Sequence, residues 1–141
     1  MRFASDRIRA EWFGADLRGQ RITALMKEVA LDAITYAEGR GWDPVLTCVL
    51  RTAAENDVLY GGHGDHVTGV HVVGRGVDIR TFDVDQAVVR TVAAYVNSEW
   101  IYDPERPVMR CAIIEGEGPG SSGPHMHLQS HPSTVPRTYP A

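Results

Sequence analysis

Long apolar runs are missing from this sequence. A membrane-spanning helix needs about 20 consecutive apolar residues, and every apolar stretch here is interrupted well before that length. Residues 1–19 carry charges throughout and have no apolar centre, so they do not have the pattern of a secretory signal. We therefore expect no membrane partner and a product made in the cytoplasm.

Basic clusters and cysteines are also scarce. The formal net charge is -4, and the basic residues are scattered along the chain, whereas nucleic-acid binding depends on a concentrated basic patch. We therefore expect no nucleic-acid partner. The two cysteines, Cys48 and Cys111, lie inside apolar runs. Buried, reduced side chains are the expectation, and a disulfide or zinc ligation are the alternatives.

The length and apolar content of the chain suffice for one domain. With 141 residues and 43% hydrophobic content, the chain can bury one core, and it shows no internal repeat. We predict a single domain over residues 1–130. Residues 131–141 contain three prolines and no apolar periodicity, which predicts a mobile tail.

The spacing of apolar residues predicts an α+β fold. Helical spacing marks residues 20–38 and a segment that begins at a cap, Asp83 or Asp85, and ends near Asn97. Short β-branched runs predict strands. We expect helices packed on one face of a small, mostly antiparallel sheet. The other expected elements are short helices within residues 1–19 and 53–60, and strands at 45–50, 70–73, 77–79, 108–114 and around 125–128.

The stretch from Gly69 to Arg80, GVHVVGRGVDIR, contains the first candidate site residues. It sets His71 and Asp78 seven residues apart, with glycines at 74 and 76 between them. If residues 70–73 form a strand, the chain turns at the glycines and returns through residues 77–79, so that the imidazole and the carboxylate face one point. This pattern predicts a metal site that needs a further ligand.

The further ligand is expected near the end of the chain. His125 and His127 are two residues apart, so in a strand they share one face while Met126 and Leu128 share the other. Two imidazole nitrogens and one carboxylate oxygen match the three protein ligands of a catalytic zinc, whose fourth position stays open. With His127 as the ligand, His125 is the nearest candidate to move a proton.

These residues resemble the zinc D-Ala-D-Ala carboxypeptidase family. Its relatives include the vancomycin-resistance dipeptidases and the phage L-alanyl-D-glutamate endopeptidases, which share a hedgehog-like fold. The first family motif, Ser-x-His-x-x-Gly-x-Ala-x-Asp, is matched by His71, Gly74 and Asp78. Gly76 replaces the Ala and Gly69 replaces the Ser. The resemblance covers roughly residues 45–130, and it implies that His71 and Asp78 bind zinc.

The second family motif differs between branches. Many members carry Glu-x-x-His with the Glu as catalytic base, but here Pro124 stands three residues before His127. Other members end in His-x-His, and on that pattern His127 binds zinc while His125 is the catalytic residue. Glu115 and Glu117, upstream in a glycine-rich loop, are alternative sources of a carboxylate.

The segment Leu50-Arg51-Thr52 resembles a third family feature, an upstream Tyr-Arg-Ser segment. The family arginine contacts the substrate near the scissile carbonyl or its terminal carboxylate. Here Leu50 stands at the aromatic position, and Thr52 stands at the Ser. On physical grounds alone, a fixed guanidinium suits both an oxyanion and a carboxylate.

The resemblance implies a zinc metallopeptidase that hydrolyses a short, D-amino-acid-containing cell-wall (peptidoglycan) peptide. A phage or prophage protein released to act on the wall is one setting, and a small cytoplasmic or exported relative is another. One alternative is a zinc-binding module of the same fold without catalysis, acting as a structural or binding protein. A second is a metal-free ligand-binding domain in which His71 and Asp78 form a plain hydrogen-bonded pair.

The remaining histidines have less specific patterns. The loop Gly-His-Gly-Asp-His contains His63, Asp65 and His66, and it is expected to be solvated, with metal binding in the loop as the alternative. His66 could also line a substrate groove. His131, beyond the last strand, is expected to face solvent.

Overall fold

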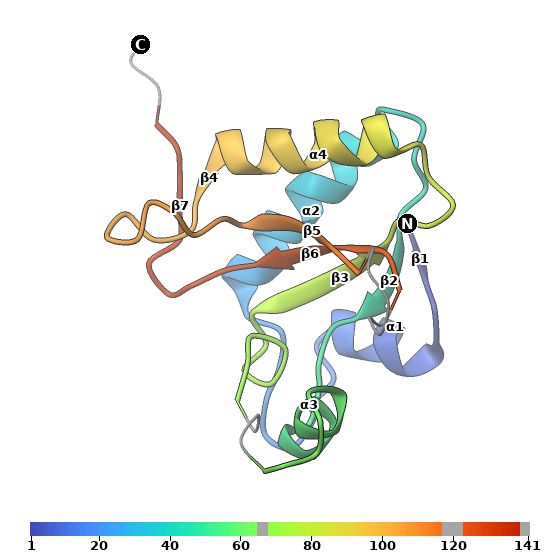
Figure 1. The fold of residues 1–141 in the computed structure, drawn as a ribbon, viewed down its shortest axis with the longest axis vertical. Helices are drawn as coiled ribbons and strands as arrows, with labels where there is room; N and C mark the ends of the chain where they lie inside the picture. The colour runs from blue at the N-terminus through green and yellow to red at the C-terminus, as the bar shows by residue number, and fades with distance from the viewer. Residues whose placement is uncertain (65–67, 117–122, 139–141) are drawn as a thin grey trace.

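The chain folds around one five-stranded sheet (Figure 1). The structure, a computed structural model, describes residues 1–64, 68–116 and 123–138. Within these ranges it is α+β, with four helices and a mostly antiparallel sheet. This agrees with the α+β class and the mostly antiparallel sheet predicted from the spacing of apolar residues.

The strand order of the sheet is β1-β2-β3-β6-β5. β1 pairs with β2 in parallel, and the other neighbours are antiparallel. A separate two-stranded ladder joins β4 to β7. The strands are β1 (Arg2–Phe3), β2 (Val45–Cys48), β3 (Gly76–Arg80), β4 (Trp100–Ile101), β5 (Ala112–Glu115), β6 (His125–Gln129) and β7 (Val135–Pro136).

Each described helix begins at a side-chain cap. Ser5, Thr23, Thr52 and Asp85 accept a hydrogen bond from a backbone N–H of the first turn that follows them. Thr52 and Glu55 form a complete capping box, which fixes the start of α3. The helices are α1 (Asp6–Trp12), α2 (Ala24–Glu38), α3 (Ala53–Leu59) and α4 (Gln86–Glu99).

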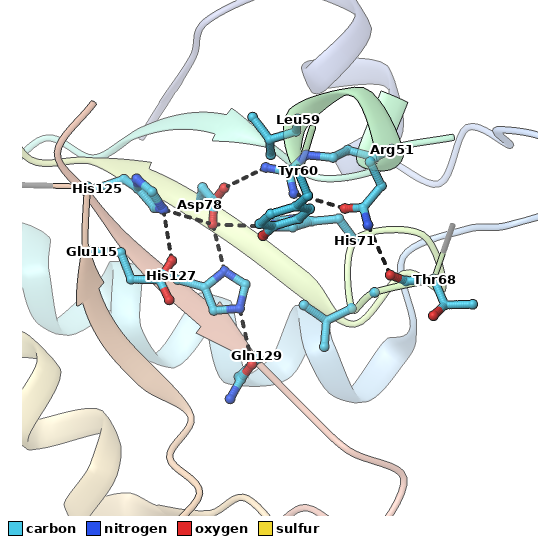
Figure 2. Close-up of a pocket in the computed structure, with 14 residues that line it drawn as sticks. Arg51, Leu59, Tyr60, Thr68, His71, Asp78, Glu115, His125, His127 and Gln129 are labelled. Atoms are coloured by element: carbon cyan, nitrogen blue, oxygen red, sulfur yellow. Dashed lines mark hydrogen bonds and ion pairs between the residues drawn. The ribbon is translucent and has the colours of Figure 1, made fainter. Parts of the chain in front are cut away.

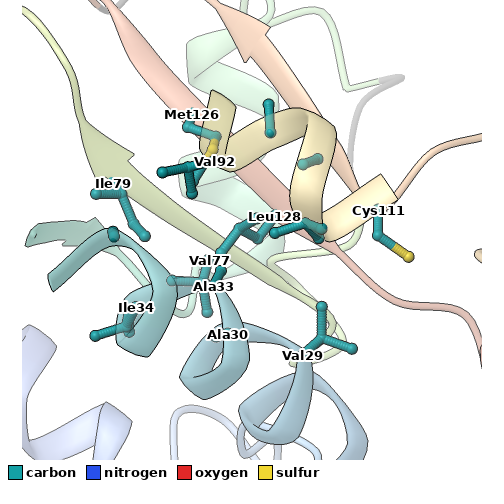
Figure 3. Packing of buried hydrophobic residues seen from close by; sticks show 14 of the residues in the cluster. Val29, Ala30, Ala33, Ile34, Val77, Ile79, Val92, Cys111, Met126 and Leu128 are labelled. Atoms are coloured by element: carbon teal, nitrogen blue, oxygen red, sulfur yellow. The ribbon is translucent and has the colours of Figure 1, made fainter. Parts of the chain in front are cut away.

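The two faces of the central strands have different surroundings. On one face α2 and α4 cover the sheet (Figure 3), and Val77, Ile79, Met126 and Leu128 are fully buried there. Because alternate residues of a strand point to opposite faces, Asp78 and His127 must lie on the other face. The apolar core and two of the predicted metal ligands, Asp78 and His127, therefore share the same two strands.

Residues 70–74 form a turn, so the strand predicted at 70–73 is wrong. Both edges of β3 are already occupied, by β2 and by β6, and no place is left for a further strand. The turn is instead tied to the chain before α2, where the Thr23 N–H donates to the Gly74 carbonyl at 2.9 Å.

Further differences lie after α4. The strand predicted at 108–114 begins only at Ala112, and Val108 lies in a turn with 85% of its surface exposed. The tail predicted from residue 131 also differs from what is observed. Val135 pairs with Ile101, and the buried Thr134 donates to the carbonyl of Tyr102 at 2.7 Å. Residues 139–141 lie outside the described ranges.

Both cysteines are free thiols, as expected. Cys111 is buried in the core, whereas Cys48 is half-buried. In the part of the chain that the structure describes, no helix has the length and apolar character to cross a bilayer.

Candidate metal centre

Asp78 lies at the centre of the site (Figure 2). It belongs to the middle strand β3, where backbone pairing sets His127 of β6 directly opposite it. His127 Nδ1 is 2.8 Å from Asp78 Oδ1, and only 6% of the Asp78 side chain is exposed. The register of β3 and β6 thus brings together two of the predicted ligands.

His71 reaches the same carboxylate from the turn before β3. Its Nε2 is 3.2 Å from Asp78 Oδ1. The imidazole lies over Gly76, where an added Cβ would be 3.1 Å from His71 Nδ1 and 2.8 Å from a methyl group of Val70. Gly76 therefore leaves free the space on the sheet face that the ring occupies. The structure brings His71, Asp78 and His127 into one cluster, as the motif predicts.

The far nitrogen of each imidazole faces a hydrogen-bond acceptor. His71 Nδ1 is 3.2 Å from the carbonyl oxygen of Val49, and His127 Nε2 is 3.1 Å from Gln129 Oε1. The Gln129 amide is oriented by its own NH2 group, which donates to the carbonyl of Arg110 at 2.8 Å. Each far nitrogen must therefore carry a hydrogen. The near nitrogens, His71 Nε2 and His127 Nδ1, face the shared carboxylate. Each presents a lone pair there if its ring is neutral, and an N–H if its ring is protonated.

Burial and charge act in opposite directions on these groups. Burial favours a neutral carboxyl at Asp78, but the charge of His71 and the hydrogen bonds from both histidines outweigh it and hold the pKa of Asp78 well below its usual range. Burial lowers the pKa of His127, whereas its hydrogen bond to Asp78 raises it, and the net pKa is raised. The buried carboxylate therefore attracts positive charge to this point of the sheet.

Arg51 and Asn56 form one wall of the site. Arg51 Nη2 donates to Asp78 Oδ2 at 3.4 Å, and Nη1 donates to Asn56 Oδ1 at 3.5 Å. The buried Asn56 also donates to the carbonyl of Thr68 at 2.9 Å. The guanidinium is thus held beside the carboxylate by long contacts, and 17% of the Arg51 side chain is exposed.

His125 lies at the rim of the cluster. Its Nε2 is 4.0 Å from Asp78 Oδ1 and 3.3 Å from Glu115 Oε2, and its Nδ1 is 2.8 Å from the carbonyl oxygen of Gly123. The His125 contact with the carboxylate is therefore longer than those of His71 and His127. Two imidazoles adjoin Asp78, and the third stands next to them.

The cluster opens onto a pocket of about 550 Å³. Other parts of its wall come from Leu59 and Tyr60 at the end of α3, from residues 68–70 and from residues 115–116. Leu59 and Tyr60 remain 44% and 55% exposed, so the pocket has an apolar rim on the side of α3. Pockets of roughly 300–1,000 Å³ accept small ligands.

Cys48 provides a second donor set that overlaps the first. It stands opposite Asp78 on β2, and the ligand atoms of Cys48, His71 and Asp78 lie within 4.8 Å of one another, so these residues could hold a metal ion. The sulfur is 3.5 Å from His71 Nδ1, the nitrogen that also faces Val49. Burial, and next the charge of Asp78, raise the pKa of the Cys48 thiol to about 12. The thiol must therefore lose a tightly held proton before it can bind a metal.

The remaining predicted residues do not join the cluster. His63 is exposed and does not line the pocket. His131 is only partly exposed, because its ring lies near Tyr102 and its Nδ1 accepts a hydrogen bond from the Ser133 N–H at 3.1 Å. The solvent exposure predicted for His131 is therefore only partly observed. Three further candidates lie outside the described residues: Asp65, His66 and Glu117.

Two residues of the site were missed by sequence reasoning. Gln129 follows His127 by two positions in the predicted strand, so the period of the strand could have placed it on the same face. Asn56 could not have been found in this way, because its position depends on how α3 meets the turn before β3. An added Cβ at Gly69 would be 3.2 Å from the Asn56 amide nitrogen, so the glycine makes room for this side chain.

Comparisons of the chain with protein-family models, with curated proteins and with solved structures give no match. The resemblance to the zinc carboxypeptidases therefore rests on the residues named above.

Proposed function

We propose that this chain is a zinc metallopeptidase that hydrolyses a short, D-amino-acid-containing peptide of the bacterial cell wall. The observation that carries the proposal is the convergence of His71 Nε2 and His127 Nδ1 on one oxygen of Asp78, at 3.2 and 2.8 Å. The donor set supports the metal. The motif resemblance supports the class of substrate.

The donor set fits a divalent cation. Without one, both imidazoles and Arg51 would converge on the single carboxylate of Asp78, a residue that is only 4% exposed. One cation instead satisfies both lone pairs and the carboxylate. Two nitrogens and one oxygen suit zinc, and the Val49 carbonyl and Gln129 supply the outer hydrogen bonds typical of zinc-binding histidines.

The chemistry follows from the residues around the donors. Zinc bound in such a site lowers the pKa of a water molecule and polarises a substrate carbonyl. His125 at the rim would accept a proton during the attack and deliver it to the leaving amine. Arg51, held by contacts to Asp78 and Asn56, would bind the developing oxyanion or a substrate carboxylate.

A closed zinc-binding module is the second candidate, and Cys48 favours it. Structural zinc sites have four protein ligands, whereas catalytic sites keep one position open. Cys48 lies close enough to His71 and Asp78 to serve as a further donor. With Cys48 in the fourth position, the protein would bind zinc without hydrolysis and act as a structural or binding component.

Zinc content of purified variants tests the metal centre. We expect about one zinc per chain in the wild type and little in Asp78→Ala or His127→Ala, because each substitution removes one of three donors. His63→Ala is the matched control, since it removes an exposed histidine outside the pocket and should keep the zinc. A wild type that neither contains zinc nor takes it up on titration would refute the metal centre.

Cobalt substitution and a peptide assay then separate the two candidates. A cysteine ligand gives Co²⁺ a strong thiolate charge-transfer band; we expect none, and we expect Cys48→Ser to keep its zinc. Wild type should release new amines or D-alanine from cell-wall peptides, and His125→Ala should lose turnover while keeping zinc. Bound zinc with a thiolate band and no hydrolysis would favour the closed module.

A further inference from the structure

We propose that Glu115 is a positioning residue for His125 and fixes its imidazole in the orientation that presents Nε2 to the pocket. This inference rests on the proposed function, in which His125 moves the proton. It gives Glu115 a different role from that of an alternative catalytic carboxylate.

Strand pairing brings the two side chains together. Glu115, the last residue of β5, stands directly opposite His125 on β6. Side chains of directly opposed residues share one face of a sheet and have Cβ atoms about 4.5–5.5 Å apart. Glu115 Oε2 accordingly lies 3.3 Å from His125 Nε2 (Figure 2).

Each ring nitrogen of His125 therefore has a partner. Nδ1 is 2.8 Å from the Gly123 carbonyl oxygen, and Nε2 faces Glu115. An imidazole turns about its Cβ–Cγ bond between two broad minima, so a single contact leaves the other orientation within reach. With acceptors on both sides, only one orientation satisfies both nitrogens of the protonated ring, which is the form that delivers the proton to the leaving amine. In that orientation Nε2 is 4.0 Å from Asp78 Oδ1, beside the donor cluster.

The end of the hairpin is shaped for this contact. Gly116 has φ 82°, and an added Cβ there would lie 1.9 Å from the Gly123 carbonyl oxygen and 3.0 Å from His125 Nδ1. The glycine thus lets the end of β5 approach the start of β6, so that Gly123 and Glu115 both reach the same ring. In the described part of the chain, no hydrogen bond or ion pair joins Glu115 to the three proposed zinc ligands.

The test compares Glu115→Ala and Glu115→Gln with Glu105→Gln, which removes the same charge from an exposed turn before β5. The first readout is NMR of the histidine ring nitrogens in zinc-loaded protein. Wild type and Glu105→Gln should show one hydrogen-bonded form of His125, and Glu115→Ala should show exchange between ring forms. Glu115→Gln keeps an acceptor oxygen and should restore part of the wild-type spectrum.

The second readout is the kinetics of cell-wall peptide hydrolysis. Glu115→Ala should lower kcat by about 10- to 100-fold with KM nearly unchanged, the scale typical of residues that orient a working histidine, and zinc content should stay at the wild-type level. A wild-type ring spectrum and kcat in Glu115→Ala would overturn the inference, and so would loss of zinc. If the wild type cleaves no cell-wall peptide, the proposed function fails, while the ring spectrum still decides whether Glu115 orients His125.

Discussion

Single glycines decide where the site histidines can lie. Gly76 leaves the space that the His71 ring fills, and an added Cβ at Gly74 would lie 1.9 Å from the carbonyl oxygen of Arg21. Gly74 also has φ 72°, a conformation that residues with a side chain rarely adopt. The turn that carries His71 is therefore held against the chain before α2 by a contact that only glycine permits.

Two alanine substitutions separate backbone strain from this contact. Gly62 has φ 73° with nothing near an added Cβ, whereas Gly74 has nearly the same φ and the close carbonyl of Arg21. Gly62→Ala should cost about 1–2 kcal/mol from strain alone. Gly74→Ala should cost more than about 3 kcal/mol, because backbone atoms must also move. Urea unfolding of both variants measures the difference. Equal losses of unfolding free energy would show that the contact between Gly74 and Arg21 does not contribute to stability.

At the scale of the elements, α3 is fastened to α1 by charged side chains. Arg7 of α1 donates to both carboxylate oxygens of Glu55 at 2.9 Å and to the buried Glu11 at 2.9 Å. Glu11 in turn accepts a hydrogen bond from the backbone N–H of Leu50 at 3.2 Å. The segment that follows β2, which includes Arg51, is thereby held between the two helices.

This connection predicts a dependence of stability on pH. The hydrogen bonds from Arg7, followed by that from the Thr52 N–H, lower the pKa of Glu55 from 4.5 to about 2. A lowered folded-state pKa means that this stabilisation is complete above pH 4.5 and is lost as the pH falls toward 2. The effect should be small, since 43% of the Glu55 side chain is exposed.

Thermal unfolding of wild type and Glu55→Gln across this range measures the effect. The stability difference between the two proteins should shrink as the solution is acidified from pH 5 to pH 2. Glu28→Gln, an exposed change on α2, is the control and should show no such trend. A difference that stays constant with pH would show that the Arg7–Glu55 pair does not contribute.

The elements that the sequence predicted well are those with local signals. β6 and α4 lie where strand period and a capping residue place them, because both signals act within a few residues. The turn at 70–74 was missed, since the alternation of valines does not show that both edges of β3 are taken. The pairing of Asp78 with His127 depends on a register between segments 49 residues apart, and spacing alone does not fix it.

At the scale of the whole molecule, core and site cannot be separated. β3 and β6 carry the buried apolar residues on one face and the histidine–aspartate cluster on the other. A ligand that joins Asp78 to His127 therefore also joins the two central strands. Binding at the site should stabilise the entire fold and not only the pocket.

Zinc removal tests this coupling. At a free zinc concentration 100 times the dissociation constant, binding to the native state alone adds about 2.7 kcal/mol, and for a chain of this size that raises Tm by roughly 10 °C. Calorimetry of the wild type with zinc and after chelation measures the shift, and Asp78→Ala should show none. A wild-type Tm that does not respond to zinc would show that the cluster binds no metal.

The long sequence separation between β3 and β6 also bears on kinetics. Pairing of segments 49 residues apart requires a long loop to close, and the entropy lost on closure is offset only after the strands are in contact. Such pairing therefore slows folding. The complete donor set exists only once this pairing is made. Zinc would then do little for the speed of folding and would chiefly lower the rate of unfolding. Where proteases cleave the unfolded chain faster than it refolds, the rate of degradation would therefore fall as the zinc concentration rises.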